Sequence, residues 1–107
     1  MDNEQKGRTP ALRGEPLRRA IRETITQFVD LNSHEIFIFG SEAMSGRNER
    51  SDIDVGILGP QPISVSVMQR IRNALGRLRT LRQFDVVDFA RADESFKAVA
   101  LQNVERL

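Results

Sequence analysis

The spacing of hydrophobic positions along the chain predicts three helices and three strands. Segments 16–30, 67–78 and 96–107 carry apolar residues at three- and four-residue intervals, as on one face of a helix. Short runs rich in β-branched and aromatic residues are typical of strands, and they occupy 35–39, 52–58 and 84–89. We expect Pro16 in the first helical position and Asp93 as the cap of the last helix. The expected order is helix, strand, connector, strand, helix, strand, helix.

The N-terminal segment differs from the rest of the chain. Residues 1–14 mix glycine, proline and charged residues without periodicity, so we expect a mobile tail followed by one domain over 15–107. No apolar stretch approaches the roughly 20 residues of a membrane span, and the polar start lacks the pattern of a secretory signal. We therefore expect a cytoplasmic protein without a membrane partner.

Composition narrows the chemistry that the chain can perform. The 107 residues include no cysteine and one histidine, which excludes disulfides, thiolate metal sites and multi-histidine metal sites. A metal site would therefore use oxygen ligands, which favours Mg²⁺ or Mn²⁺. The 16 basic and 15 acidic residues give a net charge of +1, and this balance does not favour nucleic acid as a general partner.

Two aspartates in the second predicted strand suggest such a site. Asp52 and Asp54 are two residues apart, so both side chains leave the same face of a strand. A divalent cation between them would offset their mutual repulsion, and a pair of cations can serve phosphoryl substitution. A solvent-facing strand can also carry a lone Asp-x-Asp pattern. Gly40 and Ser41 directly follow the first strand, where backbone N–H groups and a small hydroxyl can approach a phosphate.

Three motifs together resemble the minimal nucleotidyltransferases of the DNA polymerase beta superfamily. They are Phe39-Gly40-Ser41-Glu42-Ala43, Ser51-Asp52-Ile53-Asp54-Val55 and Phe84-Asp85-Val86-Val87-Asp88. The resemblance runs from about residue 35 to the C-terminus. It implies a polymerase-beta-like α/β fold, for which we expect a small mixed three-stranded core sheet with flanking helices on one side.

The resemblance also implies the roles of individual residues. The Gly-Ser pair of the family holds the nucleotide phosphates, which implies nucleotide binding by Gly40 and Ser41, with Arg47 and Ser51 in the same connector. The paired aspartates of the family bind two Mg²⁺, so Asp52 and Asp54 are implied as catalytic and metal-binding residues. The third carboxylate lies on the next core strand. Strand alternation places Asp85 and Asp88 on opposite faces, and spacing alone does not choose between them; the resemblance implies Asp85.

The implied activity is Mg²⁺-dependent transfer of a nucleoside monophosphate, expected to be AMP from ATP, to a hydroxyl of a partner protein or another acceptor, with release of pyrophosphate. The short chain leaves little surface for an acceptor, so we expect a separate helical partner. Within the family this is a substrate-binding-like protein or a HEPN-domain toxin, for which the chain would be the antitoxin. Because the chain has no tyrosine, a tyrosyl acceptor would come from that partner.

One departure from the family pattern keeps a second function open. Met44 stands where the family usually has arginine, and Ser45 stands where it has a second glycine. Without that arginine, we expect weaker binding of the nucleotide phosphates unless Arg47 or Arg50 takes its place. The alternative is a catalytically weak binding module that acts by occluding a helical partner. A receiver-type phosphoacceptor domain also clusters aspartates, but it needs about five strands alternating with helices, and the chain offers three.

Overall fold

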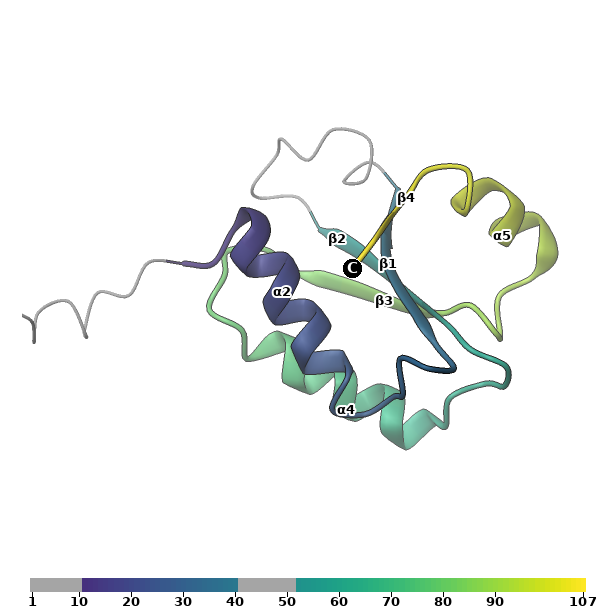
Figure 1. Cartoon of the computed structure of the whole chain (residues 1–107), viewed down its shortest axis with the longest axis horizontal. Coiled ribbons are helices and arrows are strands. Elements are labelled where there is room, and N and C mark those ends of the chain that lie inside the picture. Colours follow the sequence, from purple (N-terminus) through teal and green to yellow (C-terminus); the bar gives the residue numbers. More distant parts are fainter. Residues whose placement is uncertain (1–10, 41–51) are drawn as a thin grey trace, which may run out of the picture.

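The structure is a computed structural model that describes residues 11–40 and 52–107. The described residues form an α/β fold (Figure 1). Its helices are α2 (Gly14–Ile25), α4 (Val65–Gly76) and α5 (Glu94–Ala100), and its strands are β1 (Glu35–Phe39), β2 (Ile53–Leu58), β3 (Phe84–Asp88) and β4 (Val104–Arg106). The predicted α/β class is confirmed, and the three predicted strands are present within a residue of their expected bounds. No described helix is long and apolar enough to cross a membrane.

The strands form one mixed sheet in the order β3-β2-β1-β4. β1 is antiparallel to β2 and to β4, whereas β2 and β3 are parallel. In this register Phe39 at the end of β1 lies opposite Asp54 near the start of β2, and Asp54 lies beside Asp85 on β3. The topology therefore brings the C-terminal end of β1 next to the N-terminal parts of β2 and β3, although the three strands are far apart in the sequence.

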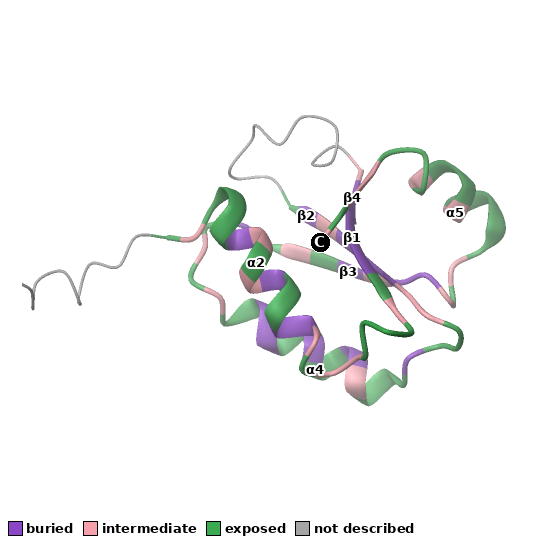
Figure 2. Cartoon of the chain, in the orientation of Figure 1, coloured by how far each residue is buried: buried purple, intermediate pink, exposed green. Residues whose placement is uncertain are grey.

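Each face of the sheet packs against different side chains. α2 and α4 lie together over one face, where they bury an aliphatic core with Ile36, Ile38 and Val55 of the strands (Figure 2). The other face carries the aromatic cluster of Phe37, Phe39 and Phe89. Helices thus lie on both faces, because Phe96 of α5 packs against the second face, with its ring 6.0 Å from that of Phe39. The expectation that all helices flank one side was wrong.

The C-terminal segment also differs from the prediction. The last helix ends at Ala100 instead of continuing to 107, and the sheet has a fourth strand, β4, which pairs with β1. Asp93 caps α5 as predicted, since its carboxylate accepts a hydrogen bond from the Phe96 N–H at 2.8 Å. The apolar spacing continued past the helix because Val104 packs beside the aromatic cluster from a strand.

The first helix begins earlier and ends earlier than its apolar spacing suggested. α2 starts at Gly14, so Pro16 is its third residue, where a missing N–H still leaves no helical hydrogen bond unmade. The chain leaves the helix after Ile25 and reaches β1 through turns. Most of the predicted tail lies outside the described residues; within its last part, the Leu12 N–H donates to the Arg79 carbonyl, and Leu12 packs against the aliphatic core.

Candidate active site

Gly40 directly follows β1 in a conformation that favours glycine. Its φ is +75°, in the left-handed region that side chains with a Cβ rarely adopt. A Cβ at this position would lie 2.5 Å from Oδ2 of Asp54. The Asp54 carboxylate therefore occupies the space that any side chain at residue 40 would need. The strand end and the carboxylate meet only because Gly40 has no side chain.

Asp54 is surrounded by negative charge. Its side chain is half-buried, and it leaves the same sheet face as Asp52 and Asp85. Burial raises the pKa of the Asp54 carboxyl above its usual range, and the charges of Asp85 and then Asp52 raise it further. Asp52 and Asp85 are themselves exposed. The structure thus brings the three predicted aspartates close enough to interact electrostatically.

Asp88 has a different environment from Asp85. It is 7% exposed, and its carboxylate accepts hydrogen bonds from the backbone N–H of Ile63 at 2.8 Å and of Ala90 at 3.1 Å. Its Oδ2 also lies 3.5 Å from Nε of Arg91. These contacts tie the loop before α4 to the end of β3. Asp88 therefore has structural partners on the α4 side, whereas Asp85 points to the face that carries Asp54.

The donor chemistry fits a divalent cation. Three carboxylates offer the hard oxygen ligands that Mg²⁺ and Mn²⁺ prefer, and the Asp54 carboxylate lies against the backbone of Gly40 because that residue has no side chain. Within 11–40 and 52–107, no three acidic or histidine side chains are grouped closely enough to ligate one ion. The described residues therefore supply the ligand types but not a preassembled cage.

Several residues predicted from the motifs lie outside the described part of the chain. These are Ser41, Arg47 and Ser51, together with the two departures from the family pattern, Met44 and Ser45. His34, for which the sequence suggested no catalytic role, lies at the opposite end of β1 from Gly40. Its Nδ1 is 3.1 Å from the Asp30 carbonyl and 2.9 Å from the Ser33 hydroxyl.

Two features of the site were not predicted from the sequence. Gly56 shares the face of Asp54, yet the rings of Phe37 and Phe89 cover it so closely that a Cβ would overlap both. Asp52, Asp54 and Gly56 alternate along one face of this segment, and only the part with the two aspartates is polar. Phe96, the first apolar residue of the last predicted helix, is 41% exposed and lies beside the aromatic cluster.

Comparison with known proteins supports the fold. A search of curated protein sequences found no significant match. A chain of a toxin–antitoxin structure with AMP-PNP has a TM-score of 0.62 and 18% identity, covering 82% of this chain and 69% of that chain. A structure of tri-AMPylated Shewanella oneidensis HEPN toxin in complex with MNT antitoxin gives 0.58 and 17%, covering 84% and 67%. Another structure from Shewanella oneidensis gives 0.63 and 14%, covering 88% and 71%.

The family assignment rests on a match that includes every described strand. A family model described as "Polymerase beta, Nucleotidyltransferase" matches residues 21–107. This range contains Gly40 and the three aspartates Asp52, Asp54 and Asp85, and the resemblance seen in the motifs is thereby confirmed. The chain belongs to the polymerase beta nucleotidyltransferase family.

Proposed function

We propose that this chain transfers AMP from ATP to a hydroxyl group of a helical partner protein. The observation that carries the proposal is the convergence of Asp52 and Asp85 on the half-buried Asp54, next to the end of β1. Nucleotidyl transfer needs a place where a polyphosphate is neutralised and an acceptor hydroxyl is deprotonated. The acidic cluster supports both requirements, because its carboxylates can hold the divalent cations that neutralise a polyphosphate and an exposed carboxylate can accept the proton of a hydroxyl.

The reaction forms one bond and breaks one bond at the α-phosphorus. The acceptor oxygen attacks that phosphorus, the bond to the oxygen bridging the α- and β-phosphates breaks, and pyrophosphate leaves with the electron pair. We assign Asp85 as the group that accepts the proton of the hydroxyl, because it is exposed and therefore accessible to an acceptor. AMP remains on the acceptor, and no covalent intermediate with the chain is needed.

Asp52, Asp54 and Asp85 would hold two Mg²⁺, with Mn²⁺ as a substitute. When bound, these ions supply charge neutralisation for the triphosphate and for the pyrophosphate leaving group. We assign the phosphates themselves to Gly40 and Ser41, with Arg47 and Ser51 from the connector. Gly40 supports this part of the proposal because its bare backbone is the kind of surface that a phosphate can approach closely.

The acceptor side of the site is a groove along the edge of β3. Asp85 lines this groove, which has a volume of about 450 Å³, and its other lining residues are mostly apolar. Arg72 and Arg91 also line it, and each donates a hydrogen bond to a backbone carbonyl, at 3.2 Å to Val86 and at 3.1 Å to Ile63. Such a groove fits a protein segment better than a highly charged nucleic acid.

The partner that we propose is a HEPN-type toxin, with this chain as its antitoxin. The structural neighbours include a tri-AMPylated HEPN toxin in complex with MNT antitoxin and a toxin–antitoxin structure with AMP-PNP. These proteins support both the nucleotide and the class of acceptor. Because the chain itself contains no tyrosine, an AMPylated tyrosine would belong to the partner.

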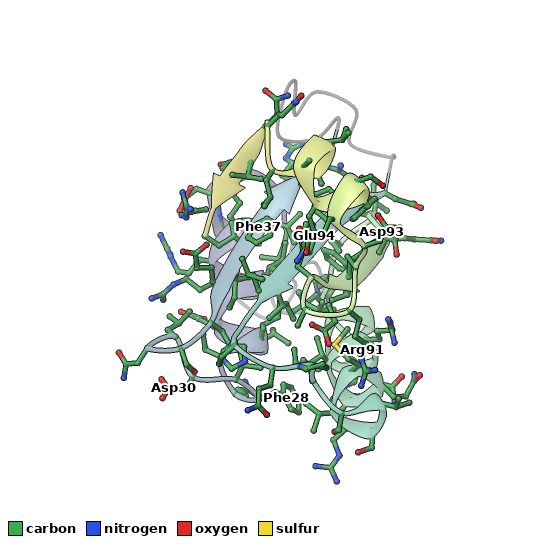
Figure 3. The ribbon with its side chains drawn as sticks, turned by 90° about the vertical axis from the view of Figure 1, so that its right-hand side faces the viewer. Phe28, Asp30, Phe37, Arg91, Asp93 and Glu94 are labelled. Atoms are coloured by element: carbon green, nitrogen blue, oxygen red, sulfur yellow. The ribbon has the colours of Figure 1, made fainter. Side chains whose placement is uncertain are left out.

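Labelled nucleotides test this function directly. The chain is incubated with Mg²⁺, with each NTP labelled at its α-phosphate in turn, and with lysate from its source. We expect one labelled protein, with ATP as the preferred donor. The label should be lost with Asp52→Asn and Asp54→Asn but retained with Asp30→Asn. Asp30, labelled in Figure 3, lies in the turn before β1, at the opposite end of that strand from Gly40. Retained labelling in the Asp54→Asn chain would refute the assignment.

A different result would favour the alternative function. If no protein is labelled, but a stable helical partner is recovered by pull-down with both the native chain and the Asp54→Asn chain, the chain acts by occluding that partner. The departure at Met44 and Ser45 from the family pattern is the observation that makes this outcome worth testing.

A further inference from the structure

An apolar pocket lies between α5 and the end of β1. No residue of α5 is fully buried, and 69% of Val99 and 41% of Phe96 are exposed. Figure 2 shows the same contrast, since α2 and α4 have buried inner faces and α5 has none. The pocket has a volume of about 370 Å³ and is lined by Phe39, Gly40, Phe96, Val99, Ala100, Gln102 and Asn103. Core packing therefore does not account for the apolar residues that α5 presents.

The position of this pocket relates it to the acidic cluster. Gly40 lines the pocket, and the Asp54 carboxylate fills the space next to Gly40 where a Cβ would be. A ligand that spans both would have an anionic, metal-binding part at Asp54 and a neutral, largely apolar part under α5. A nucleoside triphosphate has this distribution of charge. The pocket lies where the base of such a ligand could reach while its phosphates stay near Gly40.

The lining of the pocket is suited to a flat heterocycle. Phe39 and Phe96 meet edge to face, at a centroid distance of 6.0 Å and an angle of 88°, so the partly exposed Phe96 ring offers a surface for stacking. Gln102 and Asn103 add side-chain amides, and within the described residues no hydrogen bond engages either amide. None of the described residues that line the pocket is charged.

These groups favour adenine among the bases. An Asn or Gln amide can donate to N7 of adenine and accept from its N6 amino group, whereas guanine is read best by arginine or lysine. Apolar walls with an aromatic ring favour a purine over the smaller pyrimidines, because a purine offers more surface for stacking. We propose that the pocket under α5 binds the adenine of ATP, with Phe96 as the stacking residue and Gln102 and Asn103 as the residues that select the base. This inference rests on the proposed nucleotidyl transfer.

An introduced indole tests the site without an activity assay. The chain contains no tryptophan, so Phe96→Trp in the full chain creates a single fluorophore in the pocket. We expect adenosine, which has no phosphate, to change its fluorescence saturably, and we expect inorganic tripolyphosphate to leave it unchanged. Phe28→Trp is the matched control, because Phe28 lies at the end of the molecule away from α5 (Figure 3). Its fluorescence should not respond to adenosine.

A second pair of variants tests the selection of the base. Replacing Gln102 and Asn103 together by Ala should reduce the preference for adenosine over cytidine about tenfold, the effect of losing a base-reading pair of hydrogen bonds. The matched control replaces Gln69 and Asn73 by Ala. These are exposed amides of α4 that bond to each other at 3.0 Å, away from the pocket. The control should leave the preference unchanged.

The outcomes separate this inference from the proposed function. ATP-dependent labelling of a partner without any adenosine response in Phe96→Trp would overturn the adenine pocket and leave the transferase proposal intact. A saturable adenosine response without labelling would support the pocket and contradict the transferase proposal. If Phe96→Trp does not fold by circular dichroism, Val99→Trp replaces it, because the largely exposed Val99 side chain can be enlarged without disturbing the core. If adenosine leaves the fluorescence of the Val99→Trp chain unchanged, the inference is equally overturned.

Discussion

Asp54 on β2 and Asp85 on β3 are direct neighbours across parallel strands, and both side chains leave the face of the sheet that carries the aromatic cluster. Their charges interact, since Asp85 contributes to the raised pKa of Asp54 after the larger effect of burial. Two carboxylates held side by side raise the free energy of the folded chain unless a cation binds between them. The pair therefore destabilises the metal-free fold, and a role in binding a cation would explain why the two carboxylates are placed side by side.

The two aspartates of β3 should separate activity from stability. Asp85→Asn is expected to abolish AMP transfer without lowering the melting temperature, because the Asp85 side chain is exposed and its charge repels that of Asp54. Asp88→Ala leaves the buried N–H of Ile63 without its acceptor, which should lower the free energy of unfolding by about 1–3 kcal/mol. The transfer assay and thermal melts of both variants check this. Loss of transfer in a folded Asp88→Ala chain, with full activity in Asp85→Asn, would reverse the assignment.

Removing the charge of Asp54 should stabilise the metal-free chain at neutral pH. Because its pKa is higher in the folded state than in the unfolded state, the folded state holds this proton more tightly. The associated stability is greatest below the unfolded pKa and is lost as the pH rises through the folded pKa. We expect Asp54→Asn to raise the melting temperature in chelator at pH 7, with a smaller gain below the unfolded pKa.

Magnesium ions provide the check on that prediction. They should raise the melting temperature of the native chain, because binding to the folded state alone stabilises it by mass action. The same ions should have little effect on Asp54→Asn. An equal Mg²⁺ shift in both chains would mean that the ion binds elsewhere.

Much of this fold could be predicted from local patterns, and the errors lie where pairing is not local. The bounds of β1 match the run Glu35–Phe39, because the four β-branched or aromatic residues after Glu35 favour a strand whatever its partner. β4 could not be recognised, because three residues carry no periodicity of their own and Val104 is a strand residue only through its pairing with Phe39. The placement of helices on both faces was missed for the same reason, because the position of α5 depends on its contacts with the distant residues Phe39 and Phe89.

The site shows the same division. Strand alternation correctly separated Asp85 from Asp88 but could not choose between them, because the choice depends on which neighbour β3 acquires in the sheet. The pairing of Asp54 with Asp85 settles which of the two lies beside the acidic cluster. The pocket under α5 could not be predicted, since its walls come from β1 and from the segment after α5.

The cap of α5 should give a pH dependence opposite to that of Asp54. Hydrogen bonds from the Phe96 N–H and then the Ser95 hydroxyl lower the pKa of Asp93. A carboxyl with a lowered folded-state pKa contributes stability above its unfolded pKa, and this stability is lost as the pH falls through the folded value. Asp93→Ala should therefore lower the melting temperature at pH 7 and have less effect in strong acid. An equal effect at both pH values would show that the cap does not act through its charge.

Gly40 gives the sharpest test of the site geometry. Gly40→Ala forces a Cβ into the left-handed region, which costs about 1–2 kcal/mol, and places that Cβ against the Asp54 carboxylate. We expect a lower melting temperature and loss of AMP transfer, because the carboxylate must move to make room.

Gly76→Ala is the matched control. No atom lies within 4 Å of a Cβ at that helix end and its φ is ordinary, so the change should be neutral or stabilise the fold by up to about 1 kcal/mol. The two variants, compared in the same melts and transfer assays, isolate the contact with Asp54 from the general effect of replacing a glycine. Full transfer activity in Gly40→Ala would show that the approach of the strand end to Asp54 is not required for the reaction.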